Sequence, residues 1–189
     1  MGAAANTCVR IRFTIKLFAS VTLNTATVRI TNPNPATAHQ IASTPDQLIT
    51  VSAGYADNSG IIFQGTIRQA TYGRDNPTDT VLTMYATDGD LGHNFGVVNK
   101  LLQPGSTPQD HTNQAVQAMA SVGGAQSISL GYVDPAINIS SPQYPKSAAL
   151  YGMGWRVLDN VAKLKQANWS IQQGVIQIVG YQNVMPGAA

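Results

Sequence analysis

Residues 9–17, Val-Arg-Ile-Arg-Phe-Thr-Ile-Lys-Leu, alternate strictly between apolar and polar side chains. A period of two is that of a β-strand, in which successive side chains point to opposite faces of a sheet. The five apolar side chains should therefore face a core, while the three basic ones point away from it. A second alternation at residues 27–31, Thr-Val-Arg-Ile-Thr, follows a polar connection and is suited to pair with the first strand.

Further strands are predicted downstream, in segments rich in Val, Ile, Thr and Tyr: residues 48–53, 61–71 and 80–87. Turn sequences at 54–60 and 73–77 separate them. Asn32-Pro33-Asn34-Pro35 ends the second strand, because proline cannot donate to a ladder, and residues 37–43 predict a short helix over one barrel end. Five strands at short spacing favour a small antiparallel β-barrel or sandwich over residues 8–90.

The second half of the sequence mixes helical and strand patterns. Thr107-Pro108 places a hydroxyl at an N-cap and a proline at the first helical position, and Asp110 follows in the first turn. Residues 154–166 carry an apolar stripe at helical spacing, and residues 169–179 predict a hairpin that turns at Gln173-Gly174. Residues 132–145, with three prolines, predict an irregular crossover.

The whole sequence predicts a β-rich α+β protein of two domains, a small antiparallel β-barrel in residues 1–92 and a smaller α+β domain in residues 93–189. Of the 189 residues 43% are hydrophobic, which is enough for a core, but only 11% are charged, about half the usual share. The polarity comes from Asn, Gln, Ser and Thr, which suit a surface that contacts other proteins without burying charge. An ordinary domain with a neutral, solvated surface is the alternative.

The amino-acid composition also argues against an enzymatic function. All nine acidic residues are aspartate, which excludes zinc hydrolases and glycosidases that depend on a glutamate. The single cysteine, Cys8, allows no internal disulfide or thiolate zinc cluster, and it begins a strand rather than a helix. Nucleophile elbows, phosphate loops and dinucleotide fingerprints are absent from the sequence. We therefore expect no enzyme, no catalytic residue and no cofactor.

Two other groups of residues have the chemistry of sites. Asp88-Gly89-Asp90 offers two carboxylates to a divalent cation, but a turn after a strand explains this common spacing better. His39, His93 and His111 are too widely spaced for a helical metal pair, so we expect no metal site. The aromatic residues that are candidates for a sugar or base platform fit core packing better; they are Tyr55, Tyr72, Tyr85, Trp155 and Trp169.

One surface stands out. Arg10, Arg12, Lys16 and Arg29 are four of the eleven basic residues, and all fall on the polar face of two neighbouring predicted strands. This basic face is a candidate contact for an acidic neighbouring subunit, and a solvated sheet face is the alternative. A net charge of +2 argues against sequence-specific nucleic-acid binding. No apolar run approaches the ~20 residues of a membrane-spanning helix, so we expect no membrane insertion.

Five segments, taken in order, resemble one protein family. They are Val28-Arg29-Ile30-Thr31-Asn32-Pro33, Val51 to Tyr55 with Gly60 to Ile67, Ala86 to Asp90, Pro104 to Pro108, and Leu158 to Val179. Their order and spacing are similar to those of the baseplate hub proteins of contractile phage tails, which include the protein D group and the hub portion of type VI secretion spike proteins. Each segment is a packing or turn signature, so the resemblance rests on their joint order.

The resemblance implies a trimer in which each chain contributes two similar tube domains. Six such domains would face the hexameric tail tube, and a trimeric spike would dock on the other side. The implied partners are the tail tube protein, the spike protein and other baseplate proteins, in a virion assembled in the host cytoplasm. A different baseplate ring or tube-initiator protein is an alternative, as is a tail-tip carbohydrate-binding module. A cell-wall hydrolase ranks last, because no pair of acids is suitably spaced. Copy number, neighbours and host stay open.

Overall fold

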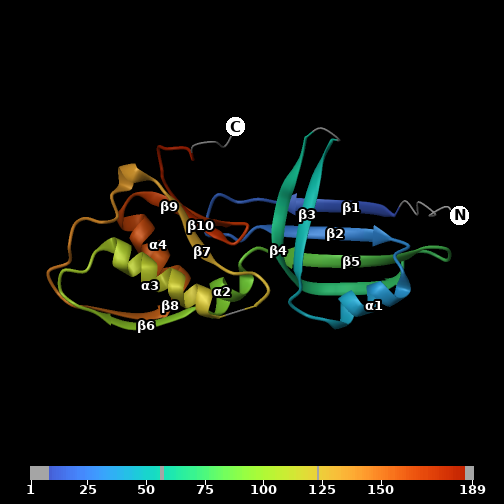
Figure 1. Cartoon of the computed structure of the whole chain (residues 1–189), viewed down its shortest axis with the longest axis horizontal. Helices are drawn as coiled ribbons and strands as arrows, with labels where there is room; N and C mark the ends of the chain where they lie inside the picture. The colour runs from blue at the N-terminus through green and yellow to red at the C-terminus, as the bar shows by residue number, and fades with distance from the viewer. Residues whose placement is uncertain (1–8, 56–57, 123, 186–189) are drawn as a thin grey trace, which may run out of the picture.

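The computed structural model describes residues 9–55, 58–122 and 124–185, and shows a strand-rich α+β chain (Figure 1). The predicted fold class is confirmed. Two groups of elements lie along the long axis of the molecule: an N-terminal half, β1 to β5 with α1, and a C-terminal half, α2 to β10 (Figure 1). Cys8, which the sequence placed at a strand start, lies outside the described residues.

The N-terminal half is one antiparallel sheet in the order β1-β2-β5-β4-β3, with one helix. Its elements are β1 (Arg10–Lys16), β2 (Thr25–Thr31), α1 (Pro35–Ser43), β3 (Leu48–Tyr55), β4 (Asn58–Arg74) and β5 (Thr80–Thr87). All five predicted strands are confirmed, and the predicted helix begins two residues earlier, at Pro35. β3 and β4 extend into the predicted turn at 54–60, as far as Tyr55 and from Asn58.

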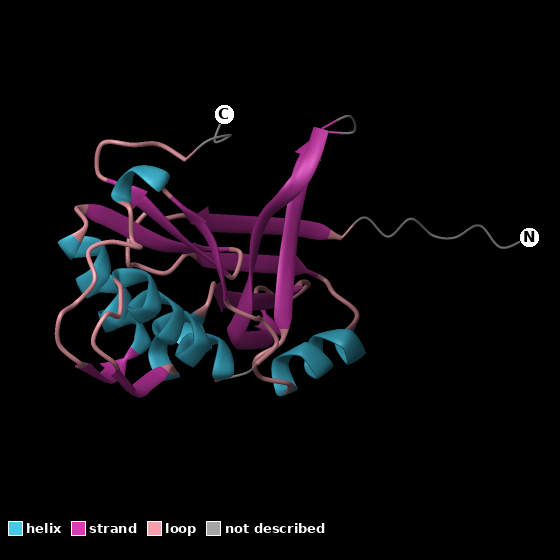
Figure 2. Cartoon of the chain, turned by 60° about the vertical axis from the view of Figure 1, so that its left-hand side comes forward, coloured by secondary structure: helices cyan, strands magenta, loops and turns pink. Residues whose placement is uncertain are grey.

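The sheet curls into a half-barrel rather than a closed one. Register shifts in the β3–β4 and β4–β5 pairs act as bulges, which bend a strand and increase its twist. The hairpin of β3 and β4 therefore rises steeply across the other strands (Figures 1 and 2). Among the described residues β1 and β3 each pair with one neighbour only, so both remain edge strands.

The inner face of the sheet holds a small core. Phe63, Leu82 and Met84 are almost completely buried there, and Ala38 of α1 packs against Leu82 and Met84 in one apolar cluster. The helix starts where the sequence predicts a strand end, because the side chain of Asn34 accepts a 2.9 Å hydrogen bond from the N–H of Ala36. The covered part of the sheet is thus its centre.

The prediction that the apolar side chains of the first strand face a core is wrong for most of them. Ile11 is 56% exposed and Phe13 is 45% exposed. Both lie across from β2 residues that point inward, Ile30 and Val28, so the prediction of the face on which the apolar side chains lie is correct. β1 is the edge strand, however, and no described element covers the inner face at that margin. The alternation of apolar and polar residues determines which face of the sheet each side chain lies on, but not whether another element covers that face.

The C-terminal half packs two helices between a three-stranded sheet and a two-stranded ribbon (Figure 1). The sheet order is β7-β10-β9, with β10 parallel to β7, and β6 pairs with β8. Its elements are α2 (Asp90–Phe95), β6 (Val97–Leu102), α3 (Pro108–Ser121), β7 (Ser129–Val133), the 3₁₀ turn η1 (Pro135–Ile137), β8 (Ala148–Met153), α4 (Gly154–Leu164), β9 (Ala167–Gln172) and β10 (Val175–Gly180).

Both predicted helices and the final hairpin are confirmed, whereas α2, β6, β7 and β8 were not predicted. These four are short, at five or six residues each. The hairpin turns where expected, with φ of 56° at Gln173 and 80° at Gly174, since a two-residue turn between twisted strands needs positive φ at both positions. The predicted crossover at 132–145 is irregular apart from the end of β7 and the turn η1.

The larger core lies between the sheet and the helices. Trp169, Ile171, Ile176 and Ile178 point from β9 and β10 onto α3 and α4, and each is at most 3% exposed. The predicted stripe of α4 supplies Leu158, Val161 and Ala162 as buried residues, and Trp155 as a half-buried one. This core therefore holds the hairpin of β9 and β10 rigidly, with the outer face of the hairpin turned away from the helices.

Helix α3 begins with a complete capping box. The Thr107 hydroxyl accepts from the N–H of Asp110 at 3.3 Å, and the Asp110 carboxylate accepts from the N–H of Thr107 at 2.7 Å. The carboxylate also accepts from the Thr107 hydroxyl at 2.9 Å. These bonds, led by the one from the Thr107 N–H, lower the pKa of Asp110 below its usual value.

A lowered pKa predicts a specific pH dependence for Asp110→Asn. The charged carboxylate stabilises the folded state above the unfolded pKa of 3.8, and this contribution is lost as pH falls through the lowered folded value. We expect the variant to be less stable than wild type at neutral pH, and we expect this deficit to be smaller near pH 2. Urea unfolding of both proteins at the two pH values measures the difference. A deficit of the same size at both would contradict this assignment.

Candidate subunit interface

The four basic residues singled out in the sequence lie together on the polar face of β1 and β2. Arg12 stands directly opposite Arg29 in the antiparallel register. Arg10, Arg12 and Lys16 are exposed, and Arg29 is half-buried. Arg29 also makes an ion pair with Asp75, at 2.9 Å between Nη2 and Oδ1. The unpaired charge of this face is therefore concentrated on β1.

Acidic groups at one end moderate the charge of the basic face. Asp79 accepts hydrogen bonds of 2.9 Å from the side chains of Asn32 and Asn76. These two bonds lower the pKa of Asp79, and the nearby charge of Arg10 adds a smaller effect in the same direction. Away from this end, Arg12 and Lys16 make no ion pair within the described part of the chain.

The opposite face of β1 is apolar and exposed. Val9, Ile11, Phe13 and Leu17 are between 44% and 60% exposed. β1 also has a free edge, whose backbone groups have no partner strand within the described residues. A free edge beside contiguous apolar side chains is typical of a protein contact surface. Sequence reasoning missed this surface, because alternation is the same in a covered and an uncovered strand.

A buried polar cluster joins the two halves of the molecule. Asp88, at the end of β5, is 1% exposed. Its carboxylate accepts from the N–H groups of Gln173 and Gly174 at 2.6 and 2.9 Å, and from Nε2 of Gln126 at 2.8 Å. Asn24 Nδ2 approaches it at 3.4 Å. Burial raises the pKa of Asp88 despite these donors, since it disfavours the charged form.

Asn24 extends this junction to the loop after β1. Its Nδ2 donates to the carbonyl of Ile171 and to Oε1 of Gln172, each at 2.9 Å, and its Oδ1 accepts from the N–H of Phe18 at 2.7 Å. Nearly all donors and acceptors of a 1%-exposed side chain are thus used between β2 and β9. The junction therefore fixes how the β9–β10 hairpin sits against the half-barrel.

The remaining candidates serve structure. Asp90 pairs with Nε of Arg68 at 2.8 Å, and so the two carboxylates of Asp88-Gly89-Asp90 are both held by protein donors. His93 stacks on Trp155 with ring centroids 5.4 Å apart. Among the described residues, no three His, Cys, Asp or Glu side chains are grouped to hold a metal ion. No helix in the described ranges is both long and apolar enough to span a membrane.

The aromatic candidates do not form one platform. Trp169 is buried in the core, Tyr72 packs edge-on against His39 with centroids 5.0 Å apart, and Tyr55 is 89% exposed near the tip of the β3–β4 hairpin. Trp155 contacts the C-terminal core and Tyr85 lies on the outer face of β5. The structure thus separates these residues among four places.

Comparison with known proteins gives the fold. No protein-family profile and no curated protein matches the sequence. The 43 kDa tail protein of prophage MuSo2 from Shewanella oneidensis superposes with a TM-score of 0.59 over 95% of this chain and 55% of its own, at 9% identity. A tail protein from Neisseria meningitidis MC58 gives 0.53 over 92% of this chain and 47% of its own, at 11% identity. The chain therefore shares the fold of these two tail proteins.

This phage tail fold is shared without close sequence relationship. The chain spans about half the length of the two solved tail proteins. Both halves of the chain take part, since the match covers nearly all of it. The expected likeness to tail proteins is confirmed at the level of the fold, and the resemblance to hub proteins stays a prediction.

Proposed function

We propose that the protein is a structural component of a phage tail baseplate, a hub that joins the hexameric tail tube to the trimeric spike. In this role the chain assembles as a homotrimer in the virion, after synthesis in the host cytoplasm, with tube, spike and other baseplate proteins as partners. The function needs no catalytic residue and no cofactor. The alternative is another baseplate ring protein or a tube initiator, which would also assemble through contacts between subunits.

The exposed β1 strand is the observation that carries this proposal. Its free edge can add to a sheet of a neighbouring subunit, and its apolar side chains can be buried by the same contact. Its other face presents Arg12 and Lys16, which would set the register against an acidic neighbour. The fold of phage tail proteins and a surface poor in charge support the same role.

The division into two domains belongs to this proposal, although the boundary expected between residues 92 and 93 falls inside the short helix α2, which packs with the C-terminal half. Each half has its own apolar core, around Leu82 and around Trp169. The cluster at Asp88 and Asn24 ties the two together by hydrogen bonds. A symmetry adaptor needs such a tie, because two tube domains of one chain must keep a fixed spacing to match a hexameric ring.

Charge reversal on β1 tests the contact. We expect Arg12→Asp with Lys16→Asp to leave the fold unchanged, since both side chains are exposed, and to prevent assembly by repelling the acidic partner. Arg10 and Arg29 are left in place because they interact with Asp79 and Asp75. Particle assembly is measured by complementation of a phage that lacks the protein, with circular dichroism to check folding.

The matched control reverses two exposed lysines elsewhere, Lys100→Asp with Lys146→Asp. This variant changes net charge by the same amount but leaves β1 intact, so we expect normal particles. Normal particles from the β1 variant as well would remove the basic face from the interface.

A further inference from the structure

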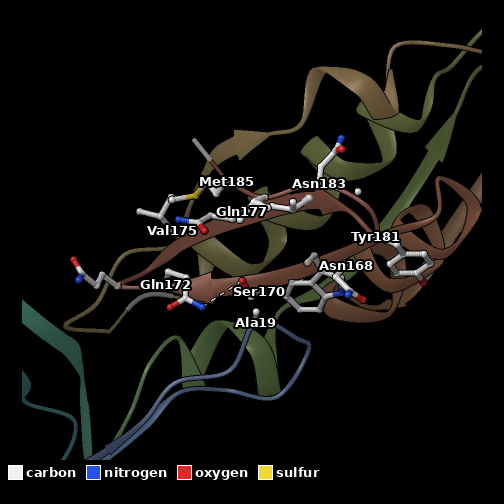
Figure 3. A pocket seen from close by; sticks show the side chains of 14 residues that line it. Ala19, Asn168, Ser170, Gln172, Val175, Gln177, Tyr181, Asn183 and Met185 are labelled. Carbon is white, nitrogen blue, oxygen red and sulfur yellow. Dashed lines mark hydrogen bonds between the residues drawn. The ribbon is translucent and has the colours of Figure 1, made fainter. Parts of the chain in front are cut away.

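A groove of about 720 Å³ crosses the outer face of the β9–β10 hairpin (Figure 3). Its floor is built from side chains that strand alternation turns away from the core, on both strands of the hairpin. Ala19 of the loop after β1 and residues 181–185 after β10 complete the lining. The floor residues are Asn168, Ser170, Gln172, Val175, Gln177 and Val179.

The lining of the groove carries no charge. None of its side chains, all in the described part of the chain, is an acid, a base or a histidine. A phosphate, a nucleotide or a charged peptide would lose its hydration there without gaining an ionic partner. The hydrogen-bonding groups that remain are amides and hydroxyls, which select an uncharged polar ligand.

The amides divide into two kinds. Gln172 Nε2 donates to the carbonyl of Phe18 at 2.9 Å, and Asn183 Nδ2 donates to Asp134 at 2.6 Å. These bonds hold the loop after β1 and the segment after β10 in place, so the groove is formed before a ligand arrives. Asn168 and Gln177 make no side-chain hydrogen bond to any described residue, and both stand in the groove.

The open amides lie next to an aromatic ring. Asn168 and Tyr181 lie towards the same end of the groove, and Gln177 lies further along it (Figure 3). Each free amide offers a donor and an acceptor side by side, which is the pattern that neighbouring sugar hydroxyls complete. Tyr181 is 58% exposed, and the face of its ring can cover the C–H face of a pyranose. Val179 adds apolar floor beside Asn168, and Val175 adds apolar floor beyond Gln177.

We propose that this groove binds a neutral oligosaccharide, with Tyr181 as the stacking residue and Asn168 and Gln177 as the hydrogen-bonding residues. This activity is separate from the assembly role, because the groove lies on the C-terminal half and the proposed interface on β1. A protein segment seated in the same groove is the competing occupant, and the test below separates the two.

The test uses the full chain labelled with ¹⁵N and two neutral probes, N-acetylchitotetraose and maltotetraose. We expect at least one of them to shift the side-chain amide signals of Asn168 and Gln177, with a dissociation constant of about 1 mM. A sulfated heparin tetrasaccharide of the same length should not shift them, since the groove has no cation. Tyr181→Ala should weaken binding about tenfold.

Tyr151→Ala is the matched control, because Tyr151 is also an exposed strand-region tyrosine, at 83%, on the distant β8. It should bind as wild type does. The proposal is overturned if neither neutral probe shifts these amides at about 10 mM. It is also overturned if Tyr151→Ala and Tyr181→Ala weaken binding equally. Protection of residues 168–183 from hydrogen exchange on assembly, without any saccharide shift, would assign the groove to a protein partner.

Discussion

Phe13→Asp should abolish assembly of the chain while leaving its fold intact. Phe13 is 45% exposed on the uncovered margin of β1, so a carboxylate there meets water in the free subunit. In the proposed assembly this position would be buried against a neighbouring subunit, where an unpaired charge costs several kcal/mol. Because this free-energy cost would recur at every contact between subunits, we expect the whole assembly to fail.

Val97→Asp is the control for this substitution. Val97 is 56% exposed in β6, another short strand, but lies far from β1 (Figure 1). Light scattering should show subunits alone for Phe13→Asp and wild-type assemblies for Val97→Asp, with equal thermal unfolding temperatures. Assembly of Phe13→Asp at wild-type concentrations would show that the apolar face of β1 is solvated in the particle.

Asp88→Ala should have the largest effect on stability. The substitution leaves the N–H groups of Gln173 and Gly174 and the amide of Gln126 without their acceptor, in a site that water does not reach. Burying such unpaired donors costs about 1–3 kcal/mol each, partly offset because a desolvated charge is removed. We expect the free energy of unfolding to fall by about 3 kcal/mol.

Asp75→Ala is the matched control, since the Asp75 carboxylate accepts a hydrogen bond from Arg29 at the surface rather than in a buried junction. An exposed ion pair contributes less than about 1 kcal/mol, so this variant should be close to wild type. Urea unfolding compares the three proteins. Near-equal stabilities for Asp88→Ala and Asp75→Ala would mean that the junction does not hold the two halves together.

Local patterns in the sequence were sufficient for the elements with a strong signal. The alternation at 9–17 and the turn at Gln173-Gly174 each determine a structure from adjacent residues. The Thr107 cap likewise works through its own backbone neighbours. β6, β7 and β8 depend on partners far away in the chain, and segments of five or six residues carry too little periodicity to reveal them.

The site was predicted only in part, for the same reason. Four basic residues on one face follow from alternation alone, and the structure places them there. The exposure of Phe13 depends on which elements cover the sheet edge, and the burial of Asp88 depends on a hairpin 85 residues later. The groove beside Tyr181 likewise joins two separate segments, Ala19 and residues 168–185. None of these long-range arrangements leaves a pattern in the local sequence.

The oligomeric state of the purified chain is the most direct test of the proposed assembly role. Multi-angle light scattering over a wide range of concentrations measures it without partner proteins. A homotrimer, growing in share with concentration, is the predicted result, and hydrogen exchange should then show protection of residues 10–16 in β1. A chain that stays monomeric at every concentration, with β1 equally exchangeable throughout, would contradict the account.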